Sequence, residues 1–535
     1  MGTKLNSFFE HQKSGSILKF VLVSLIFGLA YTQDPIYNSV ENQNTKFLHG
    51  LANAGYGFLN EDWVANTIDP LPAFTWLVQT TYEYIHPEYM FYVYYFCLFG
   101  IYVYSMFAIV DYVFNFNKSQ LKYLVYFAAF IVIHTVHLKI FEFDTGIDLH
   151  YGVALQYILG PVFQPSTFGV LLICSIYYAL DCKYYLAVCL TAIAATFHPT
   201  YLVSAGILTF SYQVTILVRE KNILKAILVG LLSLALILPV YSYMSLTFTP
   251  TTPEIWHQAQ DFIVRLRVPH HSLPQVWLKQ DGHKSYIQAL LVIIALWIVR
   301  KINLFLILLI PFVLTVASTI VQLIVDSDTI AFIAPWRMSI FLVPISSSII
   351  LGKIVFSAFD KYQVSIAKYQ KLITRLSIAI ISIIVIAGTV DQVLSFGYGK
   401  TSNQMMDFVK EQRQSGQIYL VPPDLESMKK LRLRTGVPIF INDKTHPYKD
   451  TEVLEWIDRL GQAREFYLMG DKPNDTATLR SCQLLDNLAP KYSLTHLVLY
   501  KEQRNLKCDK LNGMATLRLK PVFNNKSYQV LQIEK

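Results

Sequence analysis

The chain has 535 residues, of which 53% are hydrophobic and only 15% are charged, and it carries a formal net charge of +8. A typical soluble domain carries about 25% charged residues, so this composition excludes a wholly soluble protein. Most of the chain is expected to contact lipid.

Apolar segments long enough to span a bilayer recur from residue 17 to residue 391 and then stop. We predict eleven spans, at residues 17–32, 91–113, 121–140, 166–181, 184–198, 201–218, 224–244, 286–299, 303–324, 339–357 and 373–391. Residues 392–535 have the composition of soluble protein. The sequence therefore predicts an α-helical polytopic membrane domain, residues 1–391, followed by an extracytoplasmic α/β domain, residues 392–535.

The distribution of basic residues predicts the orientation of these spans. One set of connections contains sixteen Lys and Arg residues and the opposite set contains seven. The side with more basic residues is expected to be cytoplasmic. The N-terminus is therefore predicted on the cytoplasmic side of a plasma (inner) membrane, and the C-terminal domain on the opposite, extracytoplasmic side. This asymmetry explains most of the net charge, which gives no indication of nucleic-acid binding.

The first span follows a basic stretch, so a cleavable signal peptide is the alternative interpretation of it. The sequence after it, Thr32-Gln33-Asp34-Pro35, is a poor cleavage site, and we predict an uncleaved helix.

The long connections, residues 33–90 and 245–285, are both predicted on the outer face. Residues 74–84 have apolar side chains at nearly helical spacing, which indicates an interfacial helix. Residues 151–165 are apolar but interrupted by Pro161 and Pro165, which favours an interfacial or re-entrant helix. A cavity near the outer leaflet is the expected result.

Two acidic clusters fall in the outer connections. Asn60-Glu61-Asp62-Trp63 supplies the first, and the second contains Glu142, Asp144, Asp148 and the neighbouring His150. Carboxylates from two separate loops suit a catalytic base together with a metal or substrate clamp, and His198, at an outer helix end, could reach the same cavity. A solvated loop or a helix N-cap is the alternative for Asp62.

Basic residues on the same face predict a phosphate site. Arg265, Arg267, His270 and His271 lie in the connection 245–285, and Arg337 stands in Ala334-Pro335-Trp336-Arg337. Because guanidinium groups bind phosphate through two parallel hydrogen bonds, a lipid phosphate or diphosphate is the expected partner. Anionic headgroups or ion pairs with the acidic loops are the alternatives.

The tail shows alternating short apolar runs and helical patterns, which predict a small sheet with helices on its faces. Strands are expected at residues 417–421, 437–442, 465–470, 496–500 and 528–533, and helices at residues 403–413, 451–461 and 475–488. Neither GxGxxG nor a P-loop occurs in it. Cys482 and Cys508 are both predicted outside, where a disulfide or two reduced thiols would suit the sequence.

The arrangement resembles the GT-C superfamily of polytopic membrane glycosyltransferases, in the manner of an uncharacterised bacterial member. The resemblance rests on the acidic first outer loop, the second acidic loop, the interfacial helices and the outer C-terminal domain. It also rests on Arg434-Thr435-Gly436-Val437-Pro438-Ile439-Phe440-Ile441, on Lys444-Thr445-His446-Pro447-Tyr448 and on the stretch ending at Arg337.

The resemblance implies that Asp62, with Glu61, is the catalytic carboxylate and that Asp144 and Asp148 form the second acidic motif. Three residues separate this second pair, unlike a strict DxD, which leaves open whether a divalent metal ion is bound. The implied reaction moves a sugar from a polyprenyl-phosphate-linked donor to a glycan, lipid or protein acceptor at the outer face.

A transporter or a flippase for lipid-linked glycans is the alternative function. Such proteins commonly contain internal repeats and ionisable residues near the middle of the bilayer. The sequence shows neither a clear repeat nor a line of charges at mid-span.

Overall fold

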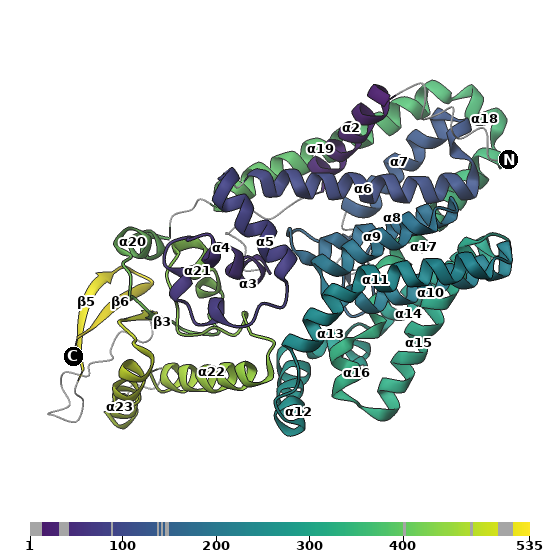
Figure 1. Cartoon of the computed structure of the whole chain (residues 1–535). Coiled ribbons are helices and arrows are strands. Elements are labelled where there is room, and N and C mark those ends of the chain that lie inside the picture. Colours follow the sequence, from purple (N-terminus) through teal and green to yellow (C-terminus); the bar gives the residue numbers. More distant parts are fainter. Residues whose placement is uncertain are drawn as a thin grey trace. The chain divides into compact units, whose positions relative to one another are not determined.

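A computed structural model describes residues 13–31, 42–86, 89–135, 139–140, 143–144, 149–399, 403–470, 475–500 and 517–534 (Figure 1). Its contacts divide the chain into two compact units. Unit 1 contains residues 1–33, 91–246 and 263–394, and unit 2 contains residues 34–90, 247–262 and 395–535.

Unit 1 is built from helices. The long ones are α2 (Lys13–Ala30), α6 (Tyr89–Phe114), α7 (Gln120–Thr135), α8 (Val170–Leu180), α9 (Tyr184–Phe197), α10 (Leu202–Thr215), α11 (Ile223–Thr247), α14 (Pro274–Val299), α15 (Leu304–Val325), α17 (Ser339–Lys361) and α19 (Gln370–Gly399). The short helices are α13 (Pro269–Ser272), α16 (Asp328–Ile333) and α18 (Gln363–Lys368), and the two-residue strands β1 (Lys139–Ile140) and β2 (Phe143–Asp144) pair antiparallel.

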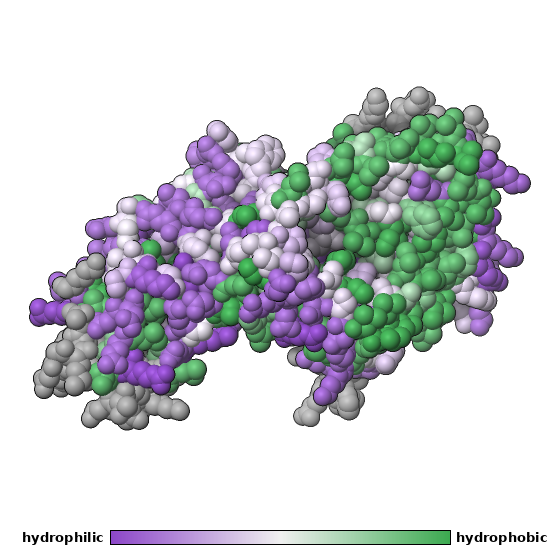
Figure 2. Space-filling model, turned by 60° about the horizontal axis from the view of Figure 1, so that its bottom comes forward, coloured by the Kyte–Doolittle hydropathy of each residue, from purple (hydrophilic) through white to green (hydrophobic). Residues whose placement is uncertain are grey.

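Each of the eleven predicted spans coincides with an apolar helix. Among the described residues, seven helical segments are long and apolar enough to cross a membrane, and four more are shorter apolar helices. Large apolar side chains on them stay exposed, including Leu231, Val316 and Ile383. Figure 2 shows the broad apolar surface that such helices produce. A helix that is apolar on every face belongs in lipid, so the chain is an integral membrane protein.

The centre of unit 1 is α17, which packs against α14, α7 and α8. Most of its first half is buried, and Gly352 lets neighbouring side chains approach closely. A Cβ at Gly352 would lie 2.8 Å from Val110 and 2.9 Å from Phe114. The residues just before α17 are therefore held in place by a well-packed helix.

Unit 2 combines the tail with two outer connections. Its helices are α3 (Gln43–Lys46), α4 (Leu48–Asn53), α5 (Pro72–Thr80), α12 (Pro253–Asp261), α20 (Gln404–Gln412), α21 (Leu431–Thr435), α22 (Asp450–Gly470) and α23 (Asp475–Tyr492). Its strands are β3 (Tyr419–Leu420), β4 (His496–Tyr500), β5 (Arg518–Asn524) and β6 (Tyr528–Glu534).

The four strands form one mixed sheet in the order β3-β4-β6-β5. β3 and β4 run parallel, with Tyr419 opposite His496, whereas β6 is antiparallel to both of its neighbours. Met405, Val437 and Val530 belong to the buried core beside this sheet. The predicted fold class, a polytopic helical region with an additional small α/β region, is confirmed.

Local sequence signals set the helix ends in unit 2. The side chain of Asn403 caps α20 by accepting from the amides of Met405 and Met406, and Thr252 caps α12 with Pro253 in its first turn. α21 ends at Gly436, whose φ of 74° lies in the left-handed region that glycine tolerates.

Segment 247–262 belongs to unit 2 because α12 packs against α22. The carboxylate of Asp450, at the start of α22, accepts hydrogen bonds from the amide (2.6 Å) and the hydroxyl (2.9 Å) of Thr251. The predicted boundary at residue 391 lies near the division at residue 394, and the first outer connection clusters with the tail.

Three expectations for local structure were wrong. Residues 465–470 belong to α22 rather than to a strand, and residues 437–442 form no strand, since Ile439 makes only an isolated bridge to Tyr419. Strand β5 had not been predicted. Residues 151–164 form no helix, because a turn at Ala154 and Leu155 and a bend at Pro161 interrupt the chain before a 3-10 turn begins at Pro165. By contrast, α5 and the π-helical turn Thr81–Ile85 confirm a helix within residues 74–84.

Candidate functional site

Asp62 lies in unit 2 and is fully buried. One carboxylate oxygen accepts from the amides of Val64 (2.9 Å) and Ala65 (3.3 Å). The other accepts from Nε of Arg432 (2.7 Å), itself 1% exposed, and from the amide of Ile439 (3.0 Å). A catalytic base needs an oxygen that can reach its substrate, so this arrangement suits a structural anchor instead.

Glu61 also contacts the tail within unit 2. Its carboxylate accepts from the hydroxyl of Ser415 (2.6 Å) and from the amide of Gly416 (2.7 Å). Both carboxylates of the first acidic cluster therefore fasten the first outer connection to the C-terminal part of the chain. These contacts suit a structural role for both residues, and the catalytic role stays a prediction that the contacts do not support.

In unit 1, residues 149–156 form a loop held by side chains from three directions. Ser347 donates to the carbonyl of Leu149 (2.7 Å), and Ser339 accepts from the amide of Val153 (2.9 Å). Gly152 is required here because a Cβ would lie 2.4 Å from the Ser339 hydroxyl. The loop is thereby fixed against the start of α17.

The tip of this loop is a tight turn with unusual backbone angles. The amide of Gln156 donates to the carbonyl of Val153 (3.2 Å), and the two residues between them, Ala154 and Leu155, have φ values of 59° and 54°. A type I′ turn requires positive φ at both central positions, which Asn and Gly tolerate better than Ala and Leu. Strain of this kind commonly accompanies a functional loop.

The turn contacts His271, one of four predicted basic residues that lie near one another. Nδ1 of His271 lies 2.7 Å from the carbonyl of Ala154, and since a carbonyl only accepts, Nδ1 carries the hydrogen. Burial lowers the pKa of His271 to about 3, and the positive charges of His270, Arg337 and Arg267 contribute in the same direction. We call these four residues the basic cluster; it joins segment 263–271 to Arg337, in the 3-10 turn Pro335–Met338 that precedes α17.

The loop also bonds to Arg337 directly. Nε of Arg337 donates to the side-chain oxygen of Gln156 (3.4 Å), and the adjacent Trp336, fully buried, donates its ring N–H to the carbonyl of His271 (2.8 Å). Trp336 and Trp277 pack together beside Ala154. The basic cluster is therefore built on a rigid aromatic support.

Arg265 differs from the other basic residues of its segment. It forms ion pairs with Asp328 (2.8 Å) and Asp326 (3.3 Å). Its charge is largely balanced within unit 1, by two carboxylates that belong to neither of the acidic clusters expected to pair with this segment.

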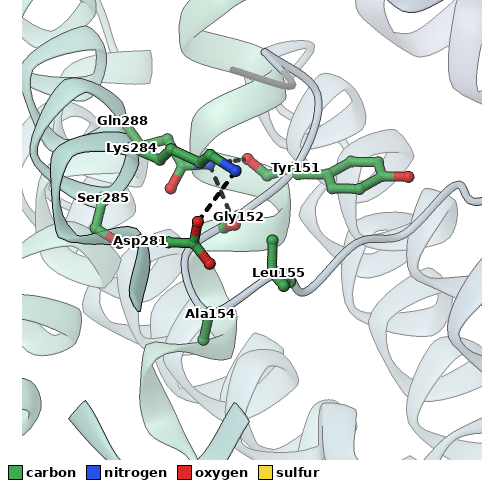
Figure 3. Close-up of a pocket in the computed structure, with 8 residues that line it drawn as sticks. All are labelled: Tyr151, Gly152, Ala154, Leu155, Asp281, Lys284, Ser285 and Gln288. Carbon is green, nitrogen blue, oxygen red and sulfur yellow. Dashed lines mark hydrogen bonds and ion pairs between the residues drawn. The ribbon is translucent and has the colours of Figure 1, made fainter. Parts of the chain in front are cut away.

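A small pocket borders the same loop (Figure 3). Gln288 donates to the carbonyls of Tyr151 (3.0 Å) and Gly152 (3.2 Å), and Lys284 pairs with Asp281 (3.0 Å). Asp281 interrupts α14 with non-helical angles (φ −131°, ψ 27°). The kink places a carboxylate and an ammonium group at the pocket, as Figure 3 shows.

The other predicted site residues lie apart from one another or outside the described set. His150 is buried among the rings of Tyr31, His134 and Tyr151. His198 contacts the ring of Tyr201 (4.9 Å between centroids), whose hydroxyl interacts electrostatically with Arg337.

Asp148 and the side chain of Asp144 lie outside the described residues. Among the residues that are described, no group of three or more His, Cys, Asp and Glu could hold a metal ion, and the divalent metal stays a prediction. Cys482 is disulfide-bonded, and Cys508 lies outside the described residues.

The sequence did not single out several residues that position this site. Gln156 and Gln288 have neutral amide side chains in apolar stretches of the sequence, and neither belongs to a recognisable motif. A polar residue inside an apolar helix, as at Gln288, was the available signal. In unit 2, the pairing of Arg432 with Asp62 gave no such signal, because the two residues are 370 apart in the chain.

Residues 400–463 match a family model described as "Domain of unknown function (DUF6798)". No curated protein matches the sequence. Among solved structures, the chain is similar to the crystal structure of ArnT from Cupriavidus metallidurans bound to undecaprenyl phosphate, with 11% identity, 97% of this chain and 98% of that chain covered, and a TM-score of 0.48. At this TM-score the similarity decides neither the fold nor the function of the present chain.

Proposed function

We propose that the chain is a membrane glycosyltransferase that moves a sugar from a polyprenyl-phosphate-linked donor to an acceptor at the outer face of the membrane. The observation that supports this most strongly is the basic cluster of Arg267, His270, His271 and Arg337 in unit 1. It adjoins apolar helices long enough to cross a bilayer, where the phosphate of a lipid would lie.

The chemistry of the cluster suits a phosphate ester. Arginine stays charged at any physiological pH and offers donors in a fork that matches two phosphate oxygens. His271 is neutral at pH 7 because its pKa is about 3, so the permanent positive charge comes from the two arginines. Since like charges repel each other, a bound anion would relieve an unfavourable interaction within the cluster.

In the proposed reaction, an acceptor hydroxyl attacks the anomeric carbon. The new carbon–oxygen bond forms while the bond from that carbon to the donor phosphate breaks, and the lipid phosphate leaves with the electron pair. Arg337 and Arg267 would stabilise the charge that develops on the departing phosphate. We further propose Asp144 or Asp148 as the carboxylate that takes the hydroxyl proton, in place of Asp62 and Glu61.

A transfer assay in proteoliposomes tests this function. Protein is supplied with a panel of polyprenyl-phosphate-linked sugars, and release of free polyprenyl phosphate is followed. We expect release with at least one donor and a loss of about a hundredfold or more in Arg337→Ala. Asp144→Asn and Asp148→Asn, tested separately, should identify the base.

The transporter alternative predicts a different outcome in the same vesicles. If no donor is cleaved but a labelled lipid-linked sugar crosses the sealed bilayer in a protein-dependent manner, the chain is a flippase and the proposed transfer is wrong. Equal activity in Arg337→Ala and the unmodified protein would also contradict the proposal.

A further inference from the structure

The chain between α17 and α19 carries a concentration of positive charge that the proposed transfer reaction does not use. The short helix α18 lies in this stretch (Figure 1). Residues 353–375, which we call the basic connection, contain one acidic residue, Asp360, and five basic ones, so their net charge is five minus one, or +4. The basic residues are Lys353, Lys361, Lys368, Lys371 and Arg375.

The basic connection lies at one surface of the membrane. Its two ends belong to segments that are long and apolar enough to cross a bilayer, Asp328–Lys361 and Gln370–Phe396. Only residues 362–369 join these segments, and a further crossing by a helix would need about 20 residues. The chain therefore turns back at a membrane surface, and α18 forms the turn.

The basic connection and the basic cluster belong to opposite ends of α17. Arg337 lies in the 3-10 turn that precedes this helix, and Lys361 is its last residue. The 23 residues of α17, at a rise of 1.5 Å each, give a length of about 35 Å, enough to cross the hydrocarbon core of a bilayer. A phosphate at Arg337 and a ligand at α18 would thus lie at different faces of the membrane.

The cations of the basic connection are exposed at this surface. All five basic residues are exposed, and none of them joins an ion pair that the structure describes, even though Asp360 is exposed nearby. Two lysines contact rings instead: the ammonium of Lys361 lies 5.2 Å from the ring centre of Tyr362, and that of Lys368 lies 5.3 Å from the ring centre of Tyr369. Since an ammonium group has three hydrogens to donate, such a contact still allows it to bind an anionic oxygen.

Apolar groups are exposed beside these charges. α18 buries none of its residues, and its Val364 is 85% exposed. Tyr362 and Tyr369, on either side of the helix, are 52% and 48% exposed. Tyrosine rings and aliphatic side chains next to lysines are typical of segments that lie at the depth of lipid headgroups. This mixture favours a lipid surface over a soluble partner.

We propose that the basic connection binds the headgroups of anionic phospholipids. Lipid phosphates would contact the lysine and arginine side chains, while Val364 and the two tyrosine rings would lie at the boundary between headgroups and acyl chains. Four or more basic residues beside a membrane span attract anionic lipids, because each cation gains from the negative potential of the surface. The proposal rests on unit 1 alone and does not depend on the proposed sugar transfer.

Native mass spectrometry of the full chain in a neutral detergent tests this binding. The probes are phosphatidylglycerol and phosphatidylcholine with identical acyl chains, so that they differ in the net charge of the headgroup. We expect phosphatidylglycerol to bind about tenfold more tightly. The combined variant Lys361→Gln, Lys368→Gln and Lys371→Gln should weaken its binding about tenfold or more.

A matched control removes the same charge from unit 2. Lys410→Gln, Arg518→Gln and Lys526→Gln together replace three exposed cations and should change the binding less than about threefold. Thermal unfolding shows whether each variant folds. Because the basic cluster offers a second place for a lipid phosphate, the comparison is repeated in protein that carries Arg337→Ala, where we expect the same loss.

Three results would overturn the proposal. The first is equal binding of the two lipids. The second is that the substitutions beside α18 weaken binding no more than those in unit 2, with Arg337 present or replaced. The third is that sodium phosphate displaces phosphatidylglycerol more strongly than sodium chloride of the same ionic strength, which would indicate a site for a soluble anion. Absence of sugar transfer would contradict the proposed function and leave this inference untouched.

Discussion

At Asp62, four hydrogen bonds converge on one buried carboxylate, and one of them comes from the buried guanidinium of Arg432. Removing one partner of such a pair leaves the other charge without compensation inside the protein. We therefore expect Asp62→Asn to lower the free energy of unfolding by about 3 kcal/mol or more, measured as a lower thermal midpoint in nanodiscs.

Glu61→Gln is the matched control for this change. Glu61 is only half-buried and bonds to Ser415 and Gly416, so its loss should cost about 1 kcal/mol or less. If Asp62→Asn instead unfolds like the unmodified protein and yet loses sugar transfer, Asp62 is catalytic and the structural role assigned to it is wrong.

The lowered pKa of His271 predicts how the free energy of unfolding depends on pH. Its pKa falls from the ordinary value of 6.5 to about 3 on folding, so the unfolded chain binds one more proton between these values. This contribution to stability is fully present above pH 6.5 and is lost as the pH falls toward 3. His271→Gln should show a shallower decline in stability with acid, by up to about 1.4 kcal/mol per pH unit.

Thermal unfolding at a series of pH values measures this slope for both proteins. Gln can still donate a hydrogen bond toward the carbonyl of Ala154 but does not titrate. Parallel pH profiles for the two proteins would mean that His271 is not held neutral by its surroundings.

Among the elements, the turn at Ala154 and Leu155 offers the clearest test of backbone strain. Both residues have positive φ, which costs about 1 kcal/mol or more for each L-residue. The double substitution Ala154→Asn with Leu155→Gly installs the residue types that such a turn favours, and it should raise the free energy of unfolding by about 1 kcal/mol. An unchanged or lower thermal midpoint would show that these two side chains contribute more through contacts than they cost in strain.

A helix or strand could be predicted where the residues that specify it are neighbours in the sequence. Each predicted span became an apolar helix because hydrophobicity over about 20 residues is enough to specify one. Residues 465–470 contain an apolar run suited to a strand, yet they continue α22. There Tyr467 is buried and its hydroxyl donates to the carbonyls of Leu420 and Val498, a tertiary contact that the local pattern does not reveal.

At the scale of the whole molecule, one part of the candidate site could be predicted from the sequence and another part could not. The basic residues near Arg337 were predicted as a group, because charge against an apolar background is visible in sequence. The role of Asp62 was not, since it depends on Arg432 and Ile439, more than 350 residues later. Unit 2 is assembled from three separate stretches of chain, and only the structure shows which of them contact each other.

The central claim is that the basic cluster of unit 1 binds a lipid phosphate, and native mass spectrometry of polyprenyl-phosphate binding tests it most directly. Arg337→Ala should weaken binding about tenfold or more, whereas Arg265→Ala, which removes an arginine balanced by Asp326 and Asp328, should change it less than about threefold. Equal weakening by both substitutions, or none by either, would contradict the account.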